Sequence, residues 1–167
     1  MKVLITGGNG QVGFELRRQL ATLGEILAPS RASLDLSDAD AVSAYLAQHQ
    51  PDVVVNAAAY TAVDNAETDQ ALATRLNAEL PAQLAAYCQK RNCWLVHYSS
   101  DYVYSGEGSL PWREDDATGP CNVYGATKLA GDKAIAANGC QHLIFSYQLG
   151  IQRFWEEFLI YHAAFRR

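Results

Sequence analysis

The sequence lacks several features that define whole classes of protein. Only 5 of its 167 residues are proline and 12 are glycine, which argues against collagen-like and low-complexity chains. Charged residues make up 19% and hydrophobic residues 49%, a globular composition that argues against a disordered chain. The net charge is -5 and the sequence contains no cluster of Lys and Arg, so we expect no nucleic-acid partner and no membrane-surface partner. The length suits about one domain.

Long hydrophobic runs and a cysteine pattern are also missing. No apolar stretch approaches the ~18 residues of a membrane span. The run from Met1 to Thr6 passes directly into glycines, which is not the pattern of a signal peptide. The cysteines show irregular spacing without Cys-x-x-Cys, so they indicate neither a zinc site nor a disulfide framework. We therefore expect a cytoplasmic protein with reduced thiols.

Short apolar runs alternate with helical patterns along the chain. Strands are expected at residues 2–6, 26–28, 52–56, 94–98 and 142–145. Helices are expected after residue 10, where Val12, Leu16, Leu20 and Leu23 share one face, and at 41–49, 67–90 and 122–137, with Pro81 kinking or breaking the third. Residues 99–121 have a surface-loop composition. This alternation predicts an α/β fold, a Rossmann-like doubly wound parallel sheet with helices on both faces.

A glycine motif follows the first expected strand and opens a helix. In Gly7-x-x-Gly10-x-x-Gly13, one glycine permits the tight turn, another lets the backbone approach a pyrophosphate, and Gly13 allows close packing of helix on strand. The phosphates would lie at the positive end of the helix. An ordinary glycine-rich turn is the alternative, but the strand and helix on either side favour a dinucleotide site.

The end of the second strand bears on the choice of cofactor. The acidic residue that would hold a ribose 2'-hydroxyl is missing from the segment 27–31, and Arg31 stands there instead. Arg31 is either a solvated surface residue or a partner for a 2'-phosphate. The sequence therefore slightly favours NADPH and leaves NADH open.

Tyr124 and Lys128 stand at positions i and i+4 of the last expected helix. A lysine on the same face favours the tyrosinate, which suits Tyr124 to act as an acid or base near neutral pH. Such pairs are common on helix surfaces. Here the pair follows Ser99-Ser-Asp-Tyr102, which ends the fourth expected strand at the edge where doubly wound sheets bind ligands.

Four separated motifs resemble those of the extended short-chain dehydrogenase/reductases, and more closely the dTDP-4-dehydrorhamnose reductase family. They cover residues 6–13, 56–67, 98–104 and 122–131, in the family's order, and the resemblance extends from Met1 to Phe145. It implies the NAD(P)H-dependent reduction of a 4-keto-6-deoxy sugar nucleotide in the last step of dTDP-rhamnose synthesis. A dTDP-sugar is thus the implied substrate.

The resemblance also implies roles for individual residues. Tyr124 would protonate the carbonyl oxygen, Lys128 would bind the nicotinamide ribose and tune Tyr124, Ser100 would bond to the keto oxygen, and Asp101 would contact the sugar. The implied cofactor contacts, besides Tyr124 and Lys128, are Gly7, Gly10, Gln11, Val12, Gly13, Ser30, Arg31, Asp35, Leu36, Ala59, Tyr60, Thr61 and Tyr98. The resemblance leaves open a homodimer and a Mg²⁺ ion used by full-length members, whose site this sequence does not identify.

The resemblance stops near Phe145. Family members are nearly twice as long, so we expect residues 1–145 to form the NAD(P)-binding domain with the Tyr-x-x-x-Lys site and the C-terminal substrate domain to be missing. Residues 146–167 diverge from the family's Arg-Thr-Ser-Trp-Val-Tyr, and reading codons for the family's text in a displaced frame reproduces Ser146 to Gly150. We therefore interpret 146–167 as a frameshifted tail.

Two other functions remain open from the sequence. The chain could be a non-catalytic NAD(P)-binding remnant, since the expected substrate domain is missing. It could also be another epimerase or dehydratase of the superfamily, although Ser100-Asp101-Tyr102 does not fit the Asp-Glu that dehydratases generally place after the active-site Ser or Thr.

Overall fold

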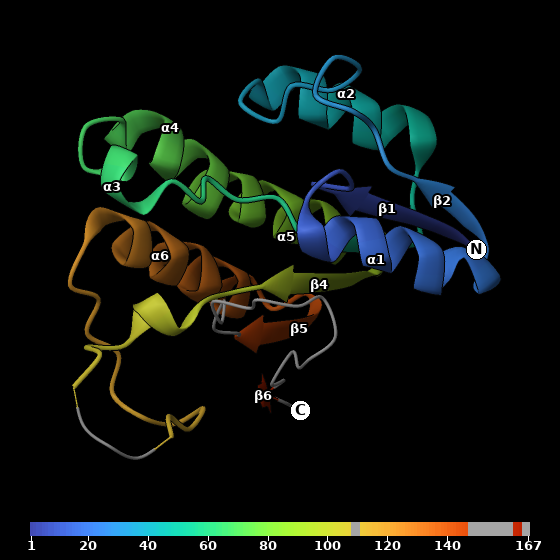
Figure 1. The fold of residues 1–167 in the computed structure, drawn as a ribbon. Coiled ribbons are helices and arrows are strands. Elements are labelled where there is room, and N and C mark those ends of the chain that lie inside the picture. Colours follow the sequence, from blue (N-terminus) through green and yellow to red (C-terminus); the bar gives the residue numbers. More distant parts are fainter. Residues whose placement is uncertain (108–110, 147–161, 165–167) are drawn as a thin grey trace.

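A single mixed sheet organises the part of the chain that the computed structural model describes, which is residues 1–107, 111–146 and 162–164. The sheet order is β2-β1-β3-β4-β5-β6 (Figure 1). The first five strands are parallel and β6 runs antiparallel to β5. The bounds are β1 Lys2–Thr6, β2 Glu25–Leu27, β3 Val53–Asn56, β4 Trp94–Tyr98, β5 Gln141–Ser146 and β6 His162–Ala164. The predicted parallel Rossmann-like sheet is confirmed.

Helices connect consecutive parallel strands. The α-helices are α1 Gln11–Gln19, α2 Ala39–His49, α3 Val63–Ala66, α4 Gln70–Thr74, α5 Leu80–Arg91 and α6 Val123–Asn138. Two 3₁₀ turns, η1 Leu20–Thr22 and η3 Asp101–Val103, and one π-helical turn, η2 Arg75–Glu79, complete the elements of the described residues.

Alternate residues of the strands enter two separate hydrophobic clusters. Val3 and Ile5 pack with Val12 and Leu16 of α1 on one face of the sheet, whereas Leu4 packs on the other face. That second face is covered by α2, α5 and α6, as Figure 1 also shows. Because both faces are covered, nearly every residue of β1 is buried, as expected for a parallel strand.

The strand order changes direction between β1 and β3. The chain leaves β1 for β2 on one side and returns to β3 on the other side of β1. In open α/β sheets the carboxyl ends of the strands diverge at such a switch point, and ligands bind in the crevice between them. The turn after β1 and the loop after β3 are therefore expected to border a ligand site.

Three differences from the expected helices have an identifiable cause, and several other boundaries are shifted by one residue. The helix expected at 67–90 is divided into α4, η2 and α5, because Pro81 lies at the start of α5 and cannot donate the preceding backbone hydrogen bond. α1 ends at Gln19, so Leu23 lies outside it and is 54% exposed instead of sharing its buried face. α2 begins at Ala39 because Asp38 accepts hydrogen bonds from Asp40 N and Ala41 N.

The proposed frameshifted tail falls mostly outside the described residues. Ser146 ends β5, and only residues 162–164 are described beyond it. The domain boundary at 145 and the origin of residues 146–167 therefore stay predictions. Within the same described residues, no helix combines the length and the apolar character needed to cross a membrane.

Candidate functional site

The turn after β1 depends on two glycines for its packing. A Cβ at Gly7, whose φ is +70°, would lie 2.7 Å from the backbone of Ala57 and Ala58. A Cβ at Gly13 would lie 2.2 Å from the carbonyl oxygen of Gly7. Gly10 is different, because a Cβ there would meet only Gly7 O at 3.3 Å. Gly7 and Gly13 are thus needed to close the turn, whereas a Cβ at Gly10 would make one tight contact, with Gly7 O.

The first turn of α1 follows this glycine turn without a side-chain cap. Gly10 is the N-cap residue, and no acidic residue stands in the first turn. By contrast, Asp38 caps α2 and Asn122 caps α6 with side-chain oxygens. The uncapped amides and the positive end of the helix dipole are suited to an anionic group such as a pyrophosphate.

A groove of about 610 Å³ opens at this switch point. It is bordered by the glycine turn, the segment after β2 and the loop after β3. Its lining includes ten of the predicted cofactor residues: Gly7, Gly10, Gln11, Val12, Arg31, Asp35, Leu36, Ala59, Thr61 and Tyr98. It also includes residues that the sequence analysis did not single out: Gly8, Asn9, Pro29, Leu34, Ser37, Ala57, Ala58, Leu72 and Leu76.

The remaining predicted residues do not line this groove. They are Gly13, Ser30, Tyr60, Ser100, Asp101, Tyr124 and Lys128.

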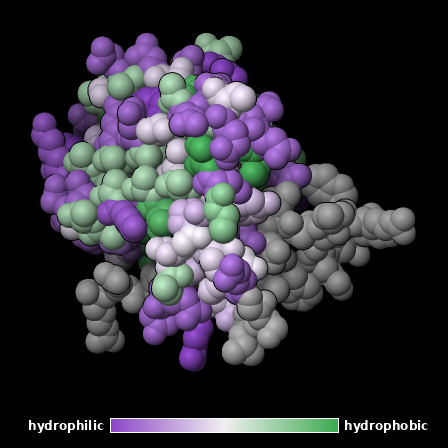
Figure 2. Space-filling model, turned by 90° about the vertical axis from the view of Figure 1, so that its left-hand side faces the viewer, coloured by the Kyte–Doolittle hydropathy of each residue, from purple (hydrophilic) through white to green (hydrophobic). Residues whose placement is uncertain are grey.

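Figure 2 shows the molecule from the side where the parallel strands end. Hydrophobic side chains gather across the middle of this face, and hydrophilic ones lie above and below. This face therefore offers hydrophobic as well as hydrophilic surface.

The segment after β2 is shaped by short-range hydrogen bonds. Asp35 Oδ1 accepts from the backbone N and the Oγ of Ser37, at 2.9 and 2.7 Å, and these bonds lower the pKa of the Asp35 carboxyl. Ser33 donates to the carbonyl of Ser30, and their two hydroxyls are 3.1 Å apart. Asp35 and Ser30 thus hold the loop that carries Arg31 along the groove.

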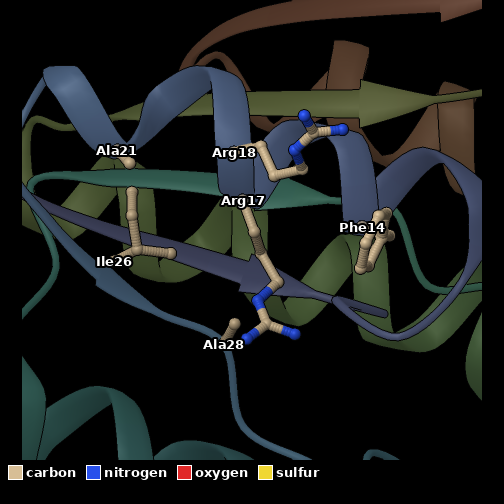
Figure 3. Close-up of a pocket in the computed structure, with 6 residues that line it drawn as sticks. All are labelled: Phe14, Arg17, Arg18, Ala21, Ile26 and Ala28. Atoms are coloured by element: carbon tan, nitrogen blue, oxygen red, sulfur yellow. The ribbon is translucent and has the colours of Figure 1, made fainter.

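A second, shallower hollow of about 390 Å³ adjoins β2 (Figure 3). In it Arg17 extends from α1 toward Ala28, directly after β2, while Arg18 points away (Figure 3). Asn9 Oδ1 accepts a long hydrogen bond of 3.4 Å from Arg17 Nη1. The sequence pointed to Ser30 and Arg31 at this corner, and Arg17 was missed because its approach depends on how α1 packs across the sheet.

Asn77 is a second residue that the sequence analysis missed. This fully buried side chain accepts from Tyr60 N at 2.8 Å and donates to Tyr60 O at 3.1 Å. Its amide nitrogen also donates to Thr127 Oγ1 at 3.2 Å. Asn77 thereby connects the loop after β3 to α6. The signal for this role in the sequence was a polar Asn within an Ala/Leu-rich helical stretch.

The end of β4 directs neighbouring serines to different partners. Ser100 Oγ accepts from Tyr102 N and donates to Asp101 Oδ1, both at 3.2 Å, and so caps η3. Ser99 donates instead to Asp132 Oδ2 of α6. Tyr124 is half-buried, and its ring meets that of Tyr102 edge-on with centroids 5.4 Å apart. Tyr124, Ser100 and Asp101 therefore lie on packed elements at the same edge of the sheet.

Lys128 is 1% exposed, and its side chain points toward the end of β4. Its Nζ donates to the carbonyl oxygen of Tyr98 at 2.6 Å and lies 3.3 Å from His97 Nε2. Burial lowers the pKa of Lys128 to about 8, although the nearby Asp132 carboxylate opposes this shift. The Nζ of Lys128 thus lies behind Tyr98, which itself lines the groove.

Within residues 1–107 and 111–146, no three His, Cys, Asp or Glu side chains are grouped so that they could hold a metal ion.

Comparisons with known proteins place these features in context. Residues 1–148 match the family model described as the RmlD substrate binding domain. A dTDP-4-dehydrorhamnose reductase from Salmonella typhimurium is 48% identical over 149 residues, which are 87% of this chain and 50% of the relative. The chain therefore spans about half the length of the curated relatives it matches.

Solved structures of reductases of the same name are also similar to this chain. A dTDP-4-dehydrorhamnose reductase from Clostridium acetobutylicum superposes with a TM-score of 0.83 at 38% identity, over 87% of this chain and 52% of that one. A reductase of the same name from Bacillus anthracis, solved in complex with NADP, gives 0.82 at 31% identity, over 88% and 53%.

Proposed function

We propose that this chain, which belongs to the RmlD substrate binding domain family, is the nicotinamide-binding half of a sugar-nucleotide reductase. The reaction would be the NAD(P)H-dependent reduction of dTDP-4-dehydro-6-deoxy-L-mannose to dTDP-L-rhamnose. Residues 1–145 would form the NAD(P)-binding domain. The curated relatives named dTDP-4-dehydrorhamnose reductase and the neighbour solved with NADP support this proposal.

One observation carries the proposal. The uncapped start of α1 and the glycine turn open onto a groove at the switch point of the sheet, and α6 brings Tyr124 to the same edge. The residues present fit a dinucleotide, because Gly10 and the uncapped first residues of α1 line the groove and can receive its pyrophosphate. When bound, the nicotinamide supplies a hydride.

The groove residues would divide the cofactor between them. Gly10, Gln11 and Val12 would contact the pyrophosphate. Ser30, Arg31, Asp35 and Leu36 would lie around the adenosine, and Ala59, Tyr60, Thr61 and Tyr98 around the nicotinamide half. Asn77 fixes the backbone of Tyr60 and so shapes the nicotinamide half without lining it.

The chain's own proton chemistry would be performed at Tyr124. Its phenol would give a proton to the carbonyl oxygen of the sugar as the carbonyl carbon is reduced. Ser100 would bond to the same oxygen and Asp101 would hold the sugar. Lys128, buried behind Tyr98, would favour the tyrosinate by its charge.

Replacing Tyr124 by Phe tests the reductase proposal. We expect Tyr124→Phe to lower turnover of NADPH with dTDP-4-dehydro-6-deoxy-L-mannose by at least ~100-fold, because a general acid contributes about that much or more. The dissociation constant of NADPH should not change, since the ring remains. Absorbance of NADPH gives the turnover, and protein fluorescence gives the binding.

Tyr102→Phe is the matched control, because its ring packs on Tyr124 and its side chain is 44% exposed. Unchanged turnover in Tyr124→Phe would remove Tyr124 from the mechanism. NADPH binding with no turnover in the parent chain would favour the non-catalytic nucleotide-binding function.

The two arginines near the end of β2 give a prediction on cofactor choice. We expect Arg17→Ala and Arg31→Ala each to weaken NADPH binding roughly tenfold to a hundredfold. Each substitution would remove a guanidinium and with it a charge-assisted hydrogen bond to the 2'-phosphate. NADH binding should stay the same. Titration calorimetry with both cofactors measures the two dissociation constants.

Arg18→Ala serves as the control, because Arg18 points away from Ala28 and forms an exposed ion pair with Glu15. An equal loss of NADPH and NADH affinity in Arg17→Ala would contradict a role in recognising the 2'-phosphate.

A further inference from the structure

A row of buried polar side chains crosses the sheet beneath α6. Thr6, Asn56 and His97 are register partners on β1, β3 and β4, and each is at most 1% exposed. They lie on the face covered by α5 and α6, because their strand neighbours Leu4, Val54 and Leu95 belong to that cluster. The row leads from the strand that precedes the glycine turn to the helix that carries Tyr124 and Lys128.

The hydrogen bonds along this row have a defined direction. Thr6 Oγ1 donates to Asn56 Oδ1 at 2.6 Å, so the amide nitrogen of Asn56 faces His97 Nδ1 at 3.0 Å. An amide nitrogen only donates, and therefore His97 Nδ1 accepts. The neutral imidazole then carries its proton on Nε2. Burial, followed by the charge of Lys128, lowers the pKa of His97 to about 4, so the ring is neutral at neutral pH.

His97 Nε2 faces two side chains of α6. Lys128 Nζ lies 3.3 Å away and Asp132 Oδ1 lies 3.4 Å away. Asp132 Oδ2 accepts from Ser99, whereas among the described residues its buried Oδ1 has no hydrogen-bond partner of good geometry. The Nε2 proton therefore has two candidate acceptors, the lone pair of a neutral Lys128 amine and the free carboxylate oxygen.

The two acceptors correspond to two protonation states of Lys128. A neutral amine can accept from Nε2–H while it donates to Tyr98 O. A charged ammonium has no lone pair, so Nε2–H and the ammonium protons would repel each other, and Asp132 Oδ1 is the acceptor that remains beside Nε2–H. The imidazole thus opposes the charged state of Lys128, and the Asp132 carboxylate favours it.

The elements that pack around Lys128 carry several ionisable groups. They are His97 and Tyr98 on β4, Tyr124, Asp132 and Lys133 on α6 itself, Asp101 and Tyr102 on η3, Arg75 and Glu79 on η2, Tyr87, Cys88, Lys90 and Arg91 on α5, Asp64 on α3, and His142 on β5. Of these, Asp132 is the group whose charge acts on the pKa of Lys128, in the raising direction.

We propose that His97 is a positioning residue that, through Nε2 and in opposition to Asp132, controls how readily Lys128 takes up a proton. The inference rests on the proposed function, in which the charge of Lys128 tunes Tyr124. His97 touches neither cofactor nor substrate, and it acts only through Lys128. Asn56 and Thr6 contribute by fixing the proton of His97 on Nε2.

The protonation of Lys128 can be measured directly in the free protein. The sequence contains only four lysines, Lys2, Lys90, Lys128 and Lys133, so a protein labelled with ¹³C-lysine gives few side-chain signals. Lys2, Lys90 and Lys133 are exposed, and Lys→Arg changes at each assign the fourth signal to Lys128 by elimination. The ¹³Cε shift followed against pH gives the titration midpoint of each lysine.

Two substitutions should move this midpoint in opposite directions. His97→Gln replaces a fixed N–H with an amide that can turn its oxygen to the ammonium, and we expect the midpoint of Lys128 to rise by about one pH unit, a tenfold gain in proton affinity. Asp132→Asn removes the negative charge that favours the ammonium, and it should lower the titration midpoint of Lys128. His142→Gln, which changes a histidine bonded to Cys140 O outside the row, is the control.

A midpoint of Lys128 that is the same in His97→Gln as in the parent would overturn the proposal. So would a shift of the same sign in both variants. Because a buried substitution can prevent folding, the ¹⁵N shifts of His97 in the unsubstituted chain give an independent test. The proposal requires a neutral ring protonated on Nε2 at neutral pH, and a ring protonated on Nδ1 would overturn it.

These measurements need no nucleotide and so are separable from the proposed function. If the titrations behave as expected but NADPH does not bind, the proposed function fails while the control of Lys128 stands. If NADPH binds and the midpoint of Lys128 does not respond to His97→Gln, only the inference about His97 fails.

Discussion

Gly13→Ala should both destabilise the fold and abolish NADPH binding. The added Cβ would lie 2.2 Å from Gly7 O and 2.8 Å from Gly8 Cα, which are backbone atoms that cannot turn aside. α1 must then move away from the glycine turn, and its first amides would leave the groove. We expect a loss of about 3 kcal/mol in the free energy of unfolding, at the upper end of the usual cost of overpacking. This loss corresponds to a fall in Tm of roughly 6–12 °C.

Gly119→Ala is the matched control, because its Cβ would meet only Ser105 at an ordinary 3.6 Å. Thermal unfolding followed by circular dichroism measures stability, and fluorescence titration measures NADPH binding. An unchanged Tm and unchanged affinity in Gly13→Ala would mean that α1 does not pack on the turn as described.

The fold could be predicted because its signals are local. The strands are short apolar runs, and the turn after β1 requires glycine at positions that a Cβ would block. The helix α2 was expected from the same kind of signal, but it starts at Ala39, two residues earlier than expected, because Asp38 caps its first amides. Pro81 likewise revealed the interruption of the long helix, though not its π-helical form.

The direction of Lys128 could not be predicted in the same way. Its spacing from Tyr124 places both residues on α6, but only the packing of α6 on β4 turns its Nζ to the carbonyl of Tyr98. The row of Thr6, Asn56 and His97 depends on the register of three strands that are distant in the sequence. Ser99 and Ser100 differ by one position, and the pleat decides which one meets Asp132.

The row beneath α6 also has a consequence for stability in acid. His97 is fully buried, and its pKa falls from the ordinary 6.5 to about 4 in the folded chain. Between these values the unfolded chain binds more protons than the folded one, so the free energy of unfolding decreases as the pH falls. The stabilisation that comes from a neutral His97 is complete above pH 6.5 and is lost as the pH falls through about 4.

The expected loss between pH 6.5 and pH 4 is about 3 kcal/mol from this one group. Urea unfolding at both pH values, on the parent and on His97→Gln, isolates it, because Gln does not titrate and other groups cancel in the difference. Asp132→Asn should deepen the loss, since the carboxylate raises the pKa of His97. If the parent and His97→Gln lose stability equally over this range, His97 does not carry the acid sensitivity. Lys128 adds nothing to this range, because its pKa of about 8 in the folded chain and its ordinary 10.5 both lie above it.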